Sequence, residues 1–132
     1  MTTIPDGLFD PLVNLEEAVA LFSHCSKLEN IPDKMFSKCT HLKDVSSMFH
    51  TGWMERIPSD IFEGCDEIEK AKRTFAFSKI TEIPAGLFSN KRHLDSVEGC
   101  FQRCENLTSI PEGLFNDCVN LRDVDMTFFK IG

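Results

Sequence analysis

Cysteine and histidine have the most versatile chemistry in this chain, which contains six of the first and four of the second. Six cysteines suffice for three disulfides, and thiols beside imidazoles are the usual components of a zinc site or a nucleophilic cysteine. Two local pairs bring these types together: His24 precedes Cys25, and Cys39 stands two residues before His41. Disulfide bonding, metal binding and thiol catalysis are therefore the chemistries to test against the pattern.

The spacing of the cysteines favours a role in packing over disulfide bonding, metal binding and thiol catalysis. Five of them stand three residues after a phenylalanine, namely Cys25, Cys39, Cys65, Cys104 and Cys118. A buried free cysteine behaves as a small hydrophobe. Cys100 and Cys104 lie four residues apart, but two cysteines on one helical turn rarely reach disulfide geometry. We expect reduced thiols that face a core.

The strong signatures of chemistry are missing from the sequence. It contains no Cys-x-x-Cys or His-x-x-x-His pair, no nucleophile elbow, no phosphate-cradling loop and no dinucleotide fingerprint. The sequence therefore predicts no metal, no cofactor and no catalytic residue, and we expect the chain not to be an enzyme.

The composition limits the classes of partner that the chain is expected to bind. The 132 residues carry a formal charge of -7, which argues against nucleic acid and against an anionic lipid surface. No stretch is long and apolar enough to insert in a membrane, and the first residues do not form a signal peptide. These properties leave an unidentified protein or glycan as the expected ligand.

The elements that position the cysteines form a repeat. Ile-Pro recurs at steps of 27, 26, 26 and 27 residues, beginning at Ile4, Ile31, Ile57, Ile83 and Ile110. Such even spacing is the signature of a solenoid in which each unit buries its apolar face against the next. We therefore interpret residues 1–132 as one repeat domain of about five coils, and we expect it to be a segment of a longer chain.

Phenylalanine divides each coil into two half-units. Ten of the 12 phenylalanines follow one another at steps of 13 or 14 residues: Phe9, Phe22, Phe36, Phe49, Phe62, Phe75, Phe88, Phe101, Phe115 and Phe128. Leu21, Phe22, Cys25 and Leu28 have the offsets of one helical face. The pattern predicts short helical turns around each phenylalanine, joined by short extended pieces, with a mostly helical solenoid as the structural alternative.

Two surface features are candidates for binding. The third and fourth coils carry a basic group made up of Lys70, Lys72, Arg73, Lys79, Lys91 and Arg92, which could bind an acidic partner or form ordinary ion pairs between coils. Trp53 stands in a half-unit that is one residue short, where it either fills a gap or serves as an exposed anchor. Because columns of a solenoid stack, we also expect a stripe formed by Glu17, Asp44, Lys70, Ser96 and Asp123.

The repeat resembles the BspA-type leucine-rich repeats of bacterial surface proteins. The resemblance rests on Phe101-x-x-Cys104-x-x-Leu107-x-x-Ile110 and on Val45-x-x-Met48-Phe49, and it covers essentially the whole chain. It implies an α/β fold, a right-handed solenoid of 26–27-residue coils with short parallel extended segments, and it brings no catalytic residues. Gly52, Ser78 and Lys91 depart from it, since each stands where cysteine is expected.

The same resemblance implies a function and a location. It suggests a non-enzymatic module for adhesion or protein binding in an exported or cell-surface bacterial protein, although the missing signal peptide leaves a cytoplasmic location open. The alternative is a structural spacer without a specific ligand. Its coils would associate end to end, because the first and last coils show no polar caps.

Overall fold

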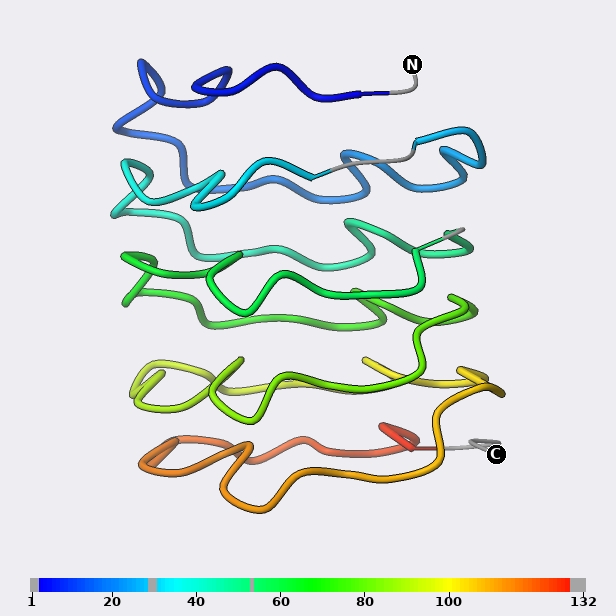
Figure 1. The fold of residues 1–132 in the computed structure, drawn as a ribbon. Helices are drawn as coiled ribbons and strands as arrows, with labels where there is room; N and C mark the ends of the chain where they lie inside the picture. Colours follow the sequence, from blue (N-terminus) through cyan, green and yellow to red (C-terminus); the bar gives the residue numbers. More distant parts are fainter. Residues whose placement is uncertain (1–2, 29–30, 53, 129–132) are drawn as a thin grey trace.

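The structure is a computed structural model that describes residues 3–28, 31–52 and 54–128. The chain winds as stacked coils, with the first coil (blue) at one end of the stack and the last (orange to red) at the other (Figure 1). Each coil begins at an Ile-Pro pair, so the second begins at Ile31 and the fifth at Ile110. The repeat solenoid that the spacing predicts is the fold that the structure shows.

Neighbouring coils are joined by a column of parallel bridges. Single-residue parallel bridges connect, in order, Glu17, Asp44, Lys70, Ser96 and Asp123. These are the five residues that the sequence places in one stripe, so that prediction is confirmed. Since only one residue of each coil takes part, the described residues contain bridges and no longer strand.

The phrase Phe-x-x-Cys-x-x-Leu folds as a series of tight turns. The Cys39 N–H donates to the Phe36 carbonyl at 2.8 Å, and the Leu42 N–H donates to the Cys39 carbonyl at 3.2 Å. The same pair of bonds occurs around Cys25 and around Cys104. The spacing of three residues is therefore the length of one hydrogen-bonded turn, repeated without a break.

The predicted helical turns are wrong for the described residues, which contain no helix. The reason lies beside each phenylalanine, where the backbone adopts a positive φ. Phe49 lies between Ser47 at 56° and Thr51 at 55°, and Phe75 lies between Arg73 at 56° and Phe77 at 61°. A left-handed residue lies two positions before each phenylalanine of the 13–14-residue register, two positions after it, or at both places, and it interrupts any helix. The mostly helical alternative fails for the same reason.

The half-unit without proline binds to the next coil through its backbone. Alternate N–H groups at Val45, Ser47 and Phe49 donate to carbonyls of the following coil at 3.0, 2.8 and 2.9 Å. Equivalent bonds start from Ala71, Arg73 and Phe75. The backbone polar groups are thus satisfied between coils, as burial requires, without a regular sheet.

Two ladders of phenylalanine rings run through the core. The first joins Phe22, Phe49, Phe75, Phe101 and Phe128, whose successive centroids lie 5.6–5.9 Å apart with planes within 15° of parallel. Phe62, Phe88 and Phe115 belong to the second ladder, at 6.0 and 5.9 Å. Phe36, Phe75, Phe88 and Phe101 are fully buried. The 13–14-residue spacing therefore marks the core, as the sequence predicts.

Candidate functional site

The cysteine columns lie inside the stack, and all six cysteines are free. The thiols do more than fill space: Cys65 Sγ donates to the Phe36 carbonyl at 3.3 Å, and Cys104 Sγ donates to the Phe75 carbonyl at 3.1 Å. Each of these carbonyls belongs to the preceding coil. A carbonyl has two lone pairs, and the Phe36 carbonyl also accepts the Cys39 N–H of its own turn. The cysteine columns therefore link successive coils.

Burial also makes these thiols poor nucleophiles. It raises the pKa of Cys65 to about 12, and it raises the pKa of Cys39, Cys104 and Cys118 as well. The reactive form of cysteine is the thiolate, which a raised pKa disfavours at neutral pH. Structure and electrostatics thus give these side chains a role in packing.

Lys91 occupies the cysteine column, and it is buried. Its ammonium donates to the Phe62 carbonyl at 2.8 Å, the bond that cysteine makes in the neighbouring coils. Asp66, which is 85% exposed, lies 3.8 Å from the same nitrogen. Lys91 therefore does not belong to a basic surface, contrary to its place in the predicted basic group.

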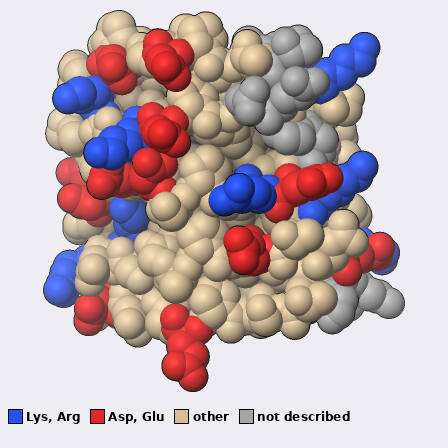
Figure 2. All heavy atoms as spheres, in the orientation of Figure 1, with Lys and Arg blue, Asp and Glu red and all other residues tan. Residues whose placement is uncertain are grey.

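Three other members of the basic group, Lys70, Lys72 and Arg73, lie near acidic side chains. Arg73 lies 3.5 Å from Glu98. Arg122 donates to Asp95 at 2.7 Å and holds the pKa of that carboxyl below its usual range, with smaller contributions from Lys70 and Lys72. Figure 2 shows basic and acidic side chains in mixed groups on the visible face, without one continuous basic area.

The remaining exposed members of the basic group, Lys79 and Arg92, lie apart from Lys70, Lys72 and Arg73. Lys79 is exposed and lines a separate hollow, in which Lys70 and Lys72 take no part. Arg92 is exposed at the end of a proline-containing half-unit, where its carbonyl accepts the Asn120 side chain at 2.8 Å. Trp53 lies outside the described residues. The structure therefore divides the predicted basic group among several surroundings.

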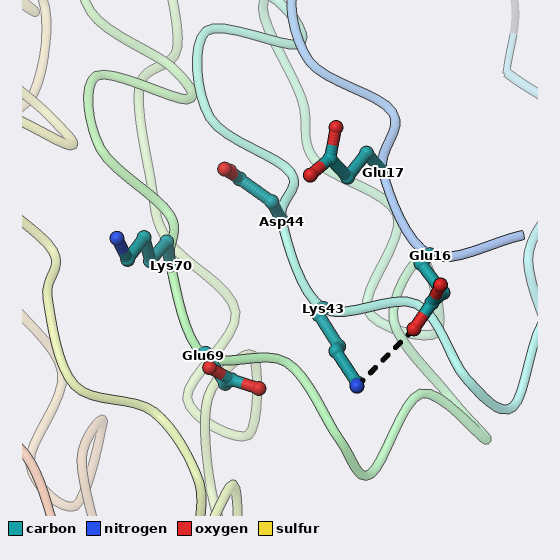
Figure 3. Close-up of a pocket in the computed structure, with 6 residues that line it drawn as sticks. All are labelled: Glu16, Glu17, Lys43, Asp44, Glu69 and Lys70. Atoms are coloured by element: carbon teal, nitrogen blue, oxygen red, sulfur yellow. Dashed lines mark ion pairs between the residues drawn. The ribbon is translucent and has the colours of Figure 1, made fainter.

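The bridge column carries the larger hollow, of about 480 Å³. Four carboxylates and two ammonium groups line it: Glu16, Glu17, Lys43, Asp44, Glu69 and Lys70. Figure 3 shows them in two columns, with the Lys43 side chain directed at Glu16, whose carboxylate lies 3.2 Å away. That pairing raises the pKa of Lys43. We call the surface formed by these six residues the bridge face.

A second hollow, of about 390 Å³, follows the other turn of the third and fourth coils. Phe77, Ser78, Lys79, Arg103, Glu105 and Asn106 line it. Phe77 could be singled out in the sequence, because it is one of two phenylalanines outside the 13–14-residue register. Arg103 and Glu105 could not, because only the stacking of coils brings them beside Phe77.

Three of the four histidines lie beside another ring or a carboxylate. The rings of His24 and His50 lie 5.9 Å apart, and His41 Nδ1 lies 3.1 Å from Glu67. Within residues 3–28, 31–52 and 54–128, no group of three His, Cys, Asp or Glu side chains could hold a metal ion. Those residues also include no helix with the length and apolar character that crossing a membrane requires.

Coils joined by parallel bridges around a ladder of apolar side chains define a leucine-rich-repeat type of solenoid. The family model described as a BspA-type leucine-rich repeat region of six copies matches residues 2–131. The chain therefore belongs to the BspA-type leucine-rich repeat family.

Solved structures of other chains are similar to this one. A leucine-rich repeat protein from Bacteroides ovatus is similar over 92% of this chain and 34% of its own, with 17% sequence identity and a TM-score of 0.35. The chain thus spans about a third of the length of that protein. No curated protein is significantly similar to the chain. The family assignment rests on the match to the repeat model.

Proposed function

We propose that the chain is a non-enzymatic protein-interaction module that binds its partner through side chains displayed by the stacked coils. The bridge face is the observation that carries this proposal. Its side chains project from backbone positions that parallel bridges fix from coil to coil. A surface fixed in this way loses little conformational entropy when a partner binds.

The charge pattern of the bridge face favours specificity. The bridge face combines four carboxylates with two ammonium groups, so a partner must match both signs in register. The hollow is broad and polar, which suits a protein surface or a glycan better than a small apolar ligand. The raised pKa of the buried thiols supports a non-catalytic role.

The family supports the biological setting. BspA-type repeats are typically non-enzymatic and associated with bacterial surfaces, so we place this module in an exported or cell-surface protein. Adhesion to an external protein or glycan is the finer form of the same proposal.

Binding to arrays of secreted proteins and glycans tests the function. The labelled chain should bind saturably to a protein, and Glu69→Lys should weaken that binding about tenfold because it reverses a charge in the hollow. Glu112→Lys is the matched control, since it makes the same change at an exposed glutamate outside the bridge face. Absence of saturable binding would contradict the function, and equal effects of both variants would contradict the role of the face.

A second candidate is a structural element that associates end to end. Nine large apolar residues on the first and last coils are exposed: Leu8, Leu12, Val13, Val19, Leu21, Ile110, Val119, Val124 and Met126. For Leu8, Leu12, Leu21 and Val124 the equivalent positions in the middle coils are buried; Leu21 is 42% exposed, whereas Met48 in the next coil is 0% exposed. A further coil stacked on either end would cover these four residues.

A further inference from the structure

We propose that the hollow around Phe77 is a docking site for an acidic segment of a partner protein, in which an apolar side chain covers the Phe77 ring while a neighbouring carboxylate meets Lys79 and Arg103. We call this hollow the Phe77 site; its lining is given above. The inference goes beyond the proposed function, because it assigns a second surface and the chemistry of what binds there.

Phe77 is exposed in a way that the core does not explain. Its side chain is 44% exposed, whereas Phe75 and Phe101, the nearest members of the ladder, are fully buried. Among the described residues it is the one large apolar side chain exposed outside the first and last coils. Exposed aromatic rings are common anchors of protein interfaces.

The backbone at Phe77 is also unusual for a bulky residue. Its φ of 61° lies in the left-handed region, like those of His24, Thr51 and Arg103, which occupy the same place in other coils. The Phe77 N–H donates to the Gln102 carbonyl at 2.8 Å, which fixes the backbone. Because this position accepts histidine, threonine and arginine elsewhere, the fold does not require phenylalanine there.

The Phe77 ring packs against His50 on one side. Its centroid lies 5.3 Å from that of His50, with the planes tilted by 44°. Burial, His24 and Arg73 together lower the pKa of His50, so its imidazole is uncharged at neutral pH and packs as a neutral ring. One side of Phe77 is therefore supported, and the side toward the hollow remains open to a ligand.

The charges around Phe77 select an acidic partner. Exposed Lys79 and Arg103 line the hollow together with one carboxylate, that of Glu105. Lys79 and Arg103 thus supply two of the three charged side chains of the hollow, on a chain whose formal charge is -7. Arginine and lysine beside an aromatic ring suit a carboxylate that follows or precedes an apolar side chain.

The walls of the site are fixed by the stack. Ser78 Oγ lies 3.4 Å from Cys104 Sγ, and the Lys79 N–H donates to the Met54 carbonyl at 3.1 Å. These bonds join three successive coils below the hollow. A volume of about 390 Å³ holds one large side chain and its neighbours but not a folded domain.

Titration of the isotope-labelled full chain with a defined peptide tests the proposal by NMR. The probe is the blocked peptide Asp-Glu-Phe-Asp-Glu; its controls are Asn-Gln-Phe-Asn-Gln, which lacks charge, and Asp-Glu-Ser-Asp-Glu, which lacks the ring. We expect saturable shifts at the amides of Phe77, Lys79 and Arg103 with the probe, and about tenfold weaker binding of each control.

Two variants and one matched control complete the experiment. Phe77→Thr installs the residue that Thr51 supplies at the same place, so the fold should persist, and binding should weaken about tenfold. Lys79→Glu should weaken it similarly, whereas Lys38→Glu, at an exposed lysine of a different coil, should not. Unchanged melting temperatures establish that the variants fold.

Several results would overturn the proposal. The first two are the absence of saturable shifts and shifts confined to the bridge face. The others are binding of heparin as strong as that of the peptide probe, and probe binding that Phe77→Thr leaves intact. Each of these results leaves the proposed function standing if the array identifies a protein partner whose binding is weakened by Glu69→Lys. Failure of the array with success of the peptide titration would instead contradict the bridge face and retain the Phe77 site.

Discussion

At the scale of single side chains, the cysteines of the two columns both fill the core and donate hydrogen bonds. A thiol is small enough to be buried beside the phenylalanine ladder, and it still donates to a carbonyl of the preceding coil, as Cys65 and Cys104 do. Serine and threonine make comparable bonds elsewhere: Thr74 Oγ1 donates to the Val45 carbonyl at 3.1 Å. The columns are therefore defined by a small donor more than by cysteine itself.

The buried thiols should make the protein less stable in alkali. Cys65 keeps its proton in the folded state up to a pKa of about 12, against an ordinary 9.0. Its contribution is complete below pH 9 and is lost as pH rises toward 12, because the unfolded thiol ionises first. The free energy of unfolding should fall by about 1.4 kcal/mol per pH unit for each such thiol.

Urea unfolding between pH 8 and 10.5 measures this slope, and Cys65→Ser is the informative variant. Serine retains a hydroxyl that can donate to the Phe36 carbonyl, but it does not titrate in this range. Its slope should be shallower than that of the parent. Equal slopes would show that Cys65 does not hold its proton.

Lys91 offers a sharper test of the column. Lys91→Cys removes a buried charge while restoring the donor found at Cys65 and Cys118, whose thiols lie 3.3 and 2.9 Å from their acceptors. We expect a gain in unfolding free energy of about 1 kcal/mol, since buried ion pairs are often replaced without loss.

Lys91→Ala is the control for that substitution. It leaves the Phe62 carbonyl without the Lys91 bond and should cost about 1–3 kcal/mol. Chemical denaturation of both variants gives the comparison. If Lys91→Cys were as destabilising as Lys91→Ala, the column would not be a hydrogen-bonding column.

The sequence identified Lys91 as an exception in the cysteine column but not its burial. Lysine is rarely buried, so a surface location was the reasonable expectation. Only the stacked backbone shows the Phe62 carbonyl that receives its ammonium at 2.8 Å. Partners that come from the preceding coil, 29 residues away, are invisible in a local pattern.

Within one coil, turns replace the helices that the apolar spacing suggests. Offsets of 0, 1, 4 and 7 fit a helical face, but three-residue turns use the same positions. The left-handed residues that decide between them share no residue type: Ala20, Ser47, Arg73 and Gly99 occupy one column. The core could therefore be predicted from the sequence, whereas the backbone conformation could not.

Two glycines provide a matched test of that conformation. Gly99 has a φ of 61°, and an added Cβ would lie 3.0 Å from Arg73 Cγ and from Gln102 Oε1. Gly86 lacks a positive φ, and a Cβ there would meet nothing within 4 Å. Gly99→Ala should cost about 1–2 kcal/mol, and Gly86→Ala should add about 0.4–1 kcal/mol. Effects of the same sign in urea unfolding would contradict the left-handed assignment.

The phenylalanine ladder can be tested with a second pair. Phe62→Ala should lower the unfolding free energy by about 3–5 kcal/mol, because that ring is 2% exposed within the ladder. Phe77→Ala makes the same chemical change at a ring that is 44% exposed, and it should cost less than about 1 kcal/mol. Equal losses would mean that the ladder is not the core.

Taken as a whole, the molecule is a stack whose middle coils are covered and whose first and last coils expose apolar side chains. Met48 is fully buried where Leu21 is 42% exposed, and Val97 is fully buried where Val124 is 51% exposed. The regular Ile-Pro and phenylalanine spacing was sufficient to predict this stack, and the resemblance of its phrases to BspA-type repeats indicated the family. Which faces carry hollows depends on contacts between coils, and the sequence pattern does not contain them.

The central claim is that this stack is an interaction module and not a self-assembling spacer. Sedimentation velocity over a hundredfold range of concentration tests it most directly, alone and with the protein that the array identifies. An interaction module should sediment as a single 15.0 kDa species at every concentration and form a saturable complex with that protein. A mass that rises steadily with concentration, without a saturable complex, would contradict it.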